Sequence, residues 1–130
     1  MNEQYISWDL SQPGLSFSLS SGRIIVFLRT LDLLGYPEFI RFLFNPDSGM
    51  FAVQTCGMND EGAKRLLIQK PDECVSIKNM DLVRLVYSSR RWNPRISYRI
   101  AGEFVHAEKL VNFDLSAAYE IHEGRIKKPS

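Results

Sequence analysis

The sequence has no long hydrophobic run. Its longest unbroken apolar stretch is residues 24–28, far below the roughly 20 residues that a helix needs to cross a bilayer. The start, Met-Asn-Glu-Gln, lacks the basic and apolar regions of a signal peptide. We therefore expect a soluble, cytoplasmic protein with no membrane partner.

Cysteine is scarce and glycosylation acceptors are absent. Cys56 and Cys74 are the two cysteines, and no Asn-x-Ser/Thr sequence occurs, which fits a reducing compartment. Together with His106 and His122 they lack the short ligand spacings that are typical of zinc sites. We therefore expect no metal and no cofactor.

The chain also has little net charge, but its two halves differ. The formal net charge is +1, so the whole-chain charge indicates no partner. Residues 1–62 carry three basic and seven acidic side chains, whereas residues 63–130 carry thirteen and eight. A basic surface that attracts nucleic acid is therefore expected in the second half.

The composition is that of a globular protein. The 130 residues are 45% hydrophobic and 24% charged, which excludes a wholly disordered or fibrous chain. This length corresponds to one domain, residues 1–130, and is enough for a buried core without disulfides.

The first half predicts a strand-strand-helix-strand-strand unit over residues 15–56. Leu15, Phe17 and Leu19 alternate with serines, which is typical of a strand with one face in water. Thr30 is expected to cap a short helix, and Gly35 to end it. Further strands are expected over residues 23–28, 38–44 and 50–56.

The second half predicts the same order over residues 64–115. Strands are expected over residues 64–70 and 74–78, then a helix from Met80 to about Arg90 that Asn79 caps. Two closing strands follow at residues 95–101 and 109–115. Residues 116–130 form a C-terminal tail whose last six residues we expect to fray.

The two halves align at an offset of 49 residues, which places residues 26–34 on residues 75–83. Both segments run from a strand through a basic residue into a helix. The chain is either an internal duplication or contains two unrelated junctions of similar composition. We predict an α+β, mostly β fold in which two such units cover each other's sheet edges as a barrel-like pseudo-dimer.

The order Gly22, Arg23, an apolar strand, a helix ending Leu34-Gly35, and a hairpin over residues 38–56 resembles the swapped-hairpin fold of AbrB-type and MraZ-type bacterial regulators. Members of that family form their barrel as homodimers. The resemblance implies a DNA-associated role in transcriptional control or in a bacterial or mobile-element system.

Candidate nucleic-acid contacts lie on and after the second helix. An arginine face able to contact phosphates, followed by a tryptophan able to stack on a base, is the pattern of a single-strand or phosphate-binding surface. The alternative is a solvated helix face and a tryptophan that anchors a loop. The candidates are Arg84, Arg90, Arg91, Trp92 and Arg95.

No catalytic motif is present, so we predict that the protein is not an enzyme. The first hypothesis is a noncatalytic DNA-associated binding module. The second is a protein interaction or assembly module with the same fold, binding a partner protein or a second copy of itself, which the acidic first half favours.

Overall fold

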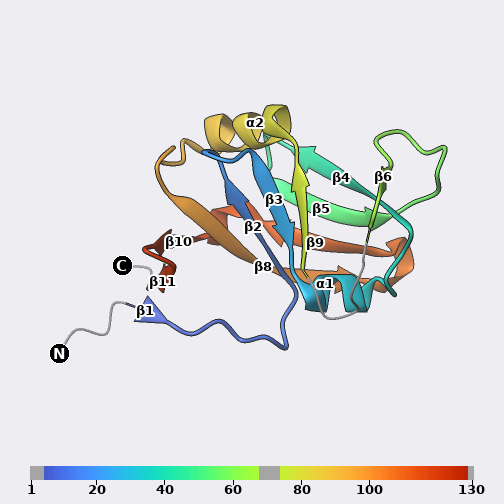
Figure 1. Cartoon of the computed structure of the whole chain (residues 1–130), viewed down its shortest axis with the longest axis horizontal. Helices are drawn as coiled ribbons and strands as arrows, with labels where there is room; N and C mark the ends of the chain where they lie inside the picture. The colour runs from blue at the N-terminus through green and yellow to red at the C-terminus, as the bar shows by residue number, and fades with distance from the viewer. Residues whose placement is uncertain (1–4, 68–73, 129–130) are drawn as a thin grey trace.

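The computed structural model describes residues 5–67 and 74–128 (Figure 1). The expected turn at residues 71–73, the end of the strand expected at residues 64–70 and the last two residues lie outside the described residues. None of the helices in the described parts is long and apolar enough to span a membrane.

The fold is mostly β, as predicted. All strand pairs are antiparallel, and they form one sheet that includes every strand. The strands are β1 Tyr5–Ile6, β2 Gly14–Ser18, β3 Arg23–Val26, β4 Phe39–Asn45, β5 Met50–Thr55, β6 Lys64–Arg65, β7 Val75–Lys78, β8 Ser97–Val105, β9 Leu110–Asp114, β10 Tyr119–His122 and β11 Arg125–Lys127.

The long strand β8 joins two parts of the sheet. Its first half pairs with β2 and β10, and its second half pairs with β9. The change of partners falls at Gly102, where an added Cβ would lie 2.5 Å from the Phe113 ring and 2.6 Å from Val111. Glycine therefore allows β8 and β9 to pack closely at this point.

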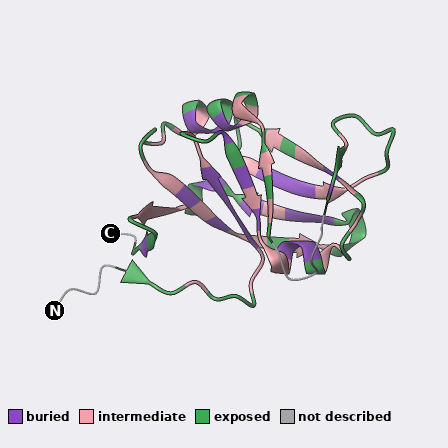
Figure 2. Cartoon of the chain, viewed as in Figure 1, coloured by how far each residue is buried: buried purple, intermediate pink, exposed green. Residues whose placement is uncertain are grey.

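The first part of the sheet continues from β2 to β3 and then to β7. The second part continues from β9 to β5, β4 and β6. The two parts face each other, because Phe17 of β2 packs edge-on against Phe51 of β5 with ring centroids 5.1 Å apart. The core lies between them (Figure 2).

The helices lie at opposite ends of the strands (Figure 1). The short helix α1, Leu28–Leu33, follows β3, and the longer helix α2, Met80–Arg90, follows β7. Two short 3-10 turns, η1 His106–Glu108 and η2 Leu115–Ala117, flank β9. α2 places Val83 and Val86, both fully buried, against the core.

Two features of the fold differ from the prediction. The sheet is not closed into a barrel: among the described residues β6 pairs with β4, β7 pairs with β3, and these two strands do not pair with each other. The C-terminal segment does not simply fray, because β10 pairs with β8 and β11 pairs with both β10 and β1. Backbone hydrogen bonds with neighbouring strands hold this segment in place. The sequence does not predict these pairs, because the two strands are short and carry several polar residues.

Local predictions for the first helix were partly wrong. Thr30 does not cap α1: it lies inside the helix, fully buried, and the helix begins after Phe27. Gly35 follows the helix end with φ +76°, as its conformational freedom predicts. The serine face of β2 is also only partly in water, because Ser16 is covered by the strands on both sides.

Candidate functional site

The helix that carries the predicted arginines begins at a side-chain cap. Asn79 Oδ1 accepts a hydrogen bond from the Leu82 amide at 3.2 Å, and Asp81 adds a negative charge in the first turn, where the helix dipole favours one. Both the cap and the helix bounds confirm the prediction. The buried side of the helix fixes which side chains face outward.

α2 ends in a left-handed turn at Arg91, whose φ is +56°. The Trp92 amide donates to the Tyr87 carbonyl at 3.0 Å, which is the backbone pattern of a helix C-terminus that turns sharply. The turn sends Trp92 back toward the core and leaves the Arg91 side chain exposed in solvent.

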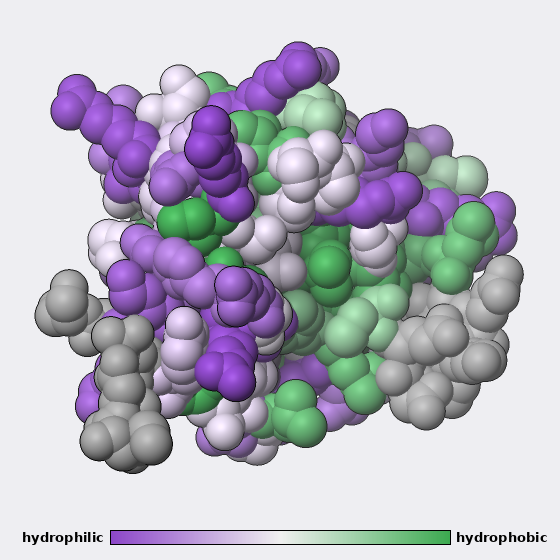
Figure 3. Space-filling model, turned by 60° about the vertical axis from the view of Figure 1, so that its left-hand side comes forward, coloured by the Kyte–Doolittle hydropathy of each residue, from purple (hydrophilic) through white to green (hydrophobic). Residues whose placement is uncertain are grey.

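Three of the predicted arginines are exposed. Arg84 lies on the exposed side of α2, and Arg91 is the residue directly after the helix. Arg95 is exposed in the following loop, where its amide donates to Asn93 Oδ1 at 3.0 Å. Long hydrophilic side chains project from the end of the molecule at which α2 lies (Figure 3).

Arg90 has a structural contact. Its Nη2 donates to the Pro46 carbonyl at 2.7 Å, in the turn between β4 and β5. A Cβ added at Gly49 would overlap Arg90 Nη1, so the guanidinium fits against the glycine of that turn. Arg90 therefore fastens α2 to the β4–β5 hairpin.

Trp92 is held in an aromatic cluster. Its ring stacks on Tyr98 with centroids 4.2 Å apart and planes 16° apart, and it meets Tyr87 edge-on at 5.2 Å. One face of the indole is therefore already occupied. The arrangement matches a tryptophan that anchors a loop, and the base-stacking role stays a prediction.

The Tyr87 hydroxyl lies within hydrogen-bonding distance of two carbonyl oxygens, 2.7 Å from that of Ile96 and 3.1 Å from that of Phe17. Burial raises the pKa of Tyr87 to about 12, because a phenolate would lose its hydration. The side chain therefore joins α2, β2 and the loop before β8 as a neutral donor.

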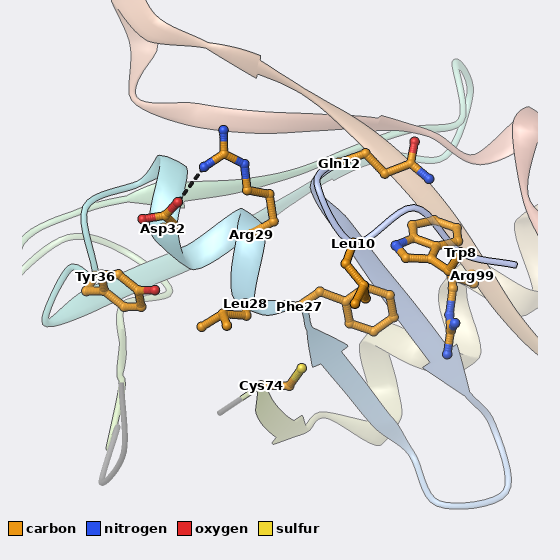
Figure 4. A pocket seen from close by; sticks show the side chains of 10 residues that line it. All are labelled: Trp8, Leu10, Gln12, Phe27, Leu28, Arg29, Asp32, Tyr36, Cys74 and Arg99. Carbon is orange, nitrogen blue, oxygen red and sulfur yellow. Dashed lines mark hydrogen bonds and ion pairs between the residues drawn. The ribbon is translucent and has the colours of Figure 1, made fainter. Parts of the chain in front are cut away.

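A groove that the sequence did not indicate lies beside α1 (Figure 4). Its volume is ≈ 500 Å³. Most of its lining is apolar or aromatic, and its side chains come from the segment before β2, from α1 and its flanks, from the residue before β7 and from β8. The lining residues are Trp8, Leu10, Gln12, Phe27, Leu28, Arg29, Asp32, Tyr36, Cys74 and Arg99.

Arg99 lines this groove next to Trp8 and Phe27. Its guanidinium carbon lies 4.8 Å from the centre of the Phe27 ring and 5.4 Å from that of Trp8. Its Nε atom is buried without a hydrogen-bond partner. Loss of hydration lowers the pKa of Arg99, and the described residues place no carboxylate in an ion pair with it.

No protein-family model, curated protein or solved structure matches this chain.

The cysteines and histidines do not gather into a metal site. Within residues 5–67 and 74–128, no three His, Cys, Asp or Glu side chains lie close enough to hold an ion. Cys56 and Cys74 are free thiols. His122 instead lies 2.8 Å from the carboxylate of Glu120 on the same strand.

The exposed arginines could be predicted because they are close together in the sequence, on α2 and directly after it. It missed the groove because Trp8, Phe27 and Arg99 are far apart in the chain and belong to three different segments. The local signal was a group of apolar and aromatic residues before the first strong strand, namely Tyr5, Ile6, Trp8 and Leu10.

Proposed function

We propose that the protein is a noncatalytic binding module that docks on DNA through Arg84, Arg91 and Arg95. The observation that carries this proposal is the exposure of these three cations at one end of the molecule. Arginine contacts to phosphates supply sequence-independent affinity and fix orientation, while base reading needs further contacts.

A pseudo-twofold arrangement of the two units supports the swapped-hairpin fold within this proposal. A twofold rotation would exchange β2 with β6, β3 with β7, β4 with β8, and β5 with β9. It turns the β2–β8 pair into the β6–β4 pair, and the β4–β5 pair into the β8–β9 pair. The same exchange maps the β3–β7 pair and the β5–β9 pair each onto itself. The β2–β3 pair has no counterpart, because β6 and β7 do not pair in the described parts of the chain.

The two units differ in their helices. α1 has 6 residues and α2 has 11. β3 and β7 begin at Arg23 and Val75, and α1 and α2 begin at Leu28 and Met80, so both pairs of elements start 52 residues apart and the predicted offset of 49 residues is wrong. Val26 and Val75, which that offset equates, are paired with each other across β3 and β7. Val26 is the last residue of β3 and Val75 is the first residue of β7, so an axis that exchanges the two strands passes through the middle of their ladder and not through this pair. The longer second helix is the part that presents Arg84.

Salt dependence of DNA binding tests the docking. Neutralising three phosphates predicts that affinity for a short fluorescein-labelled duplex falls about 40-fold between 50 and 200 mM salt. Replacing all three arginines with glutamine should remove most of this dependence in an anisotropy titration, whereas Arg65→Gln, on β6, should not. An affinity that is indifferent to salt and to the triple substitution would overturn the proposal.

The second candidate is an assembly module that has the same fold and binds protein. Two observations favour it: Arg90 and Trp92 are held by internal contacts, and the first half of the chain is acidic. It predicts no retention on a heparin column and a specific oligomer in light scattering, whereas the DNA-docking module predicts retention.

A further inference from the structure

We propose that the groove beside α1 binds a small organic anion, with an apolar body against Trp8, Leu10 and Phe27 and its negative group against Arg99. This site is separate from the arginines of α2, which lies at the opposite end of the strands (Figure 1). It does not depend on DNA binding.

The groove has the size and chemistry of a small-molecule site. Its ≈ 500 Å³ lies within the range of pockets that enclose ligands, and such pockets are mostly apolar with few polar groups. Leu10 is 84% exposed at the groove. An apolar ligand would cover this side chain and the neighbouring aromatic rings, which is the favourable contribution expected from a hydrophobic body.

The charges of the groove select an anion. Arg29, which also lines it, pairs with Asp32 one helical turn away, so these two charges offset each other. Arg99 has no such partner in the described parts of the chain, and the faces of Trp8 and Phe27 hold its guanidinium in place. A fixed, partly dehydrated guanidinium binds a carboxylate, sulfonate or phosphate group well, because its planar donors match these oxygens.

A second depression shares Trp8 and Arg99 with this groove. Tyr5, Ile6 and Arg125 line it together with Trp8 and Arg99. Arg125 stacks on Tyr5 with its guanidinium carbon 5.0 Å from the ring centre. A second cation near Arg99 makes the surroundings more favourable to an anion and less favourable to a neutral ligand.

Two fluorescent probes with nearly the same apolar body test the role of charge. 8-Anilinonaphthalene-1-sulfonate carries one anionic group, and N-phenyl-1-naphthylamine carries none. We expect the first to bind the wild-type protein, and Arg99→Gln to weaken it about tenfold or more, the loss of one charged contact. The neutral probe should bind both proteins alike, and Arg23→Gln, at the other end of β3, should change neither.

A measurement on the wild-type protein locates the site without a substitution. Cys74 lines the groove and is exposed, whereas Cys56 lies elsewhere. The anionic probe should slow alkylation of Cys74 by iodoacetamide and leave the rate at Cys56 unchanged, as peptide mass spectrometry would show. Anionic probe binding that Arg99→Gln leaves intact, or equal alkylation of Cys74 with and without the probe, would overturn the proposal.

Discussion

Thr30 is fully buried, and its hydroxyl makes two hydrogen bonds, one as acceptor and one as donor. Oγ1 accepts from the Gly14 amide at 2.8 Å and donates to the Gly14 carbonyl at 2.8 Å. At the scale of single residues, a buried polar group of this kind stabilises the fold mainly because removing it leaves its partners without a hydrogen bond. Thr30 therefore ties α1 to the start of β2.

Thr30→Val should lower the free energy of unfolding by about 1 to 3 kcal/mol, because the Gly14 amide loses its hydrogen-bond acceptor while the shape is retained. The Gly14 carbonyl still accepts from the Phe27 amide at 3.0 Å. Thr30→Ser keeps the hydroxyl and loses one methyl group, so it should cost about 1 kcal/mol. Urea unfolding measures both. Equal stability of the valine variant and the wild type would contradict the role of this hydroxyl.

Tyr87 makes stability depend on pH in the alkaline range. Because its pKa rises from 10.0 to about 12 on folding, the folded state holds the proton more tightly than the unfolded state. Its contribution is complete below pH 10 and is lost as the pH rises from 10 through 12. Between pH 9 and 11.5, the urea concentration at the unfolding midpoint should therefore fall less for Tyr87→Phe than for the wild type. Equal decreases would contradict the raised pKa of Tyr87.

At the scale of elements, the β4–β5 hairpin is held by a side chain from another element. Arg90→Ala removes the hydrogen bond to the Pro46 carbonyl and should lower stability by about 1 to 2 kcal/mol in urea unfolding. Arg91→Ala, the next residue but exposed in solvent, should stay within about 0.5 kcal/mol of the wild type. If the two variants are equally stable, Arg90 is not a structural residue.

Most elements followed from local sequence signals. The cap at Asn79 and the apolar period of the next residues predicted α2 with its correct ends, and the turn residues around Gly49 predicted the β4–β5 hairpin. These signals act over a few residues, so sequence alone carries them. Gly35, at the end of α1, is a further example.

The partners of the strands could not be predicted in the same way. Alternation in β2 shows that one face is buried, but not that β8 is the neighbour, because register over long separations is set by packing. The same holds for β10 and β11, which are short and polar. The site residues show the same limit of sequence-based prediction. Arg90 and Arg91 are adjacent residues of one type, but Arg90 contacts the β4–β5 turn and Arg91 is exposed in solvent.

At the scale of the whole molecule, both units of the proposed pseudo-twofold fold come from one chain. In this arrangement no second chain is needed to supply a strand partner. We therefore expect a mass of 15.0 kDa in multi-angle light scattering, independent of concentration. A stable mass of twice this value would contradict a self-contained arrangement and favour the assembly module.

The most direct test of DNA docking is the map of amide chemical-shift changes in an ¹⁵N spectrum when a short duplex is added. We predict that the largest changes fall within residues 80–96, with little change at the groove residues Trp8 and Phe27. Changes confined to other parts of the chain, or no change at Arg84, Arg91 and Arg95 at low salt, would contradict the account.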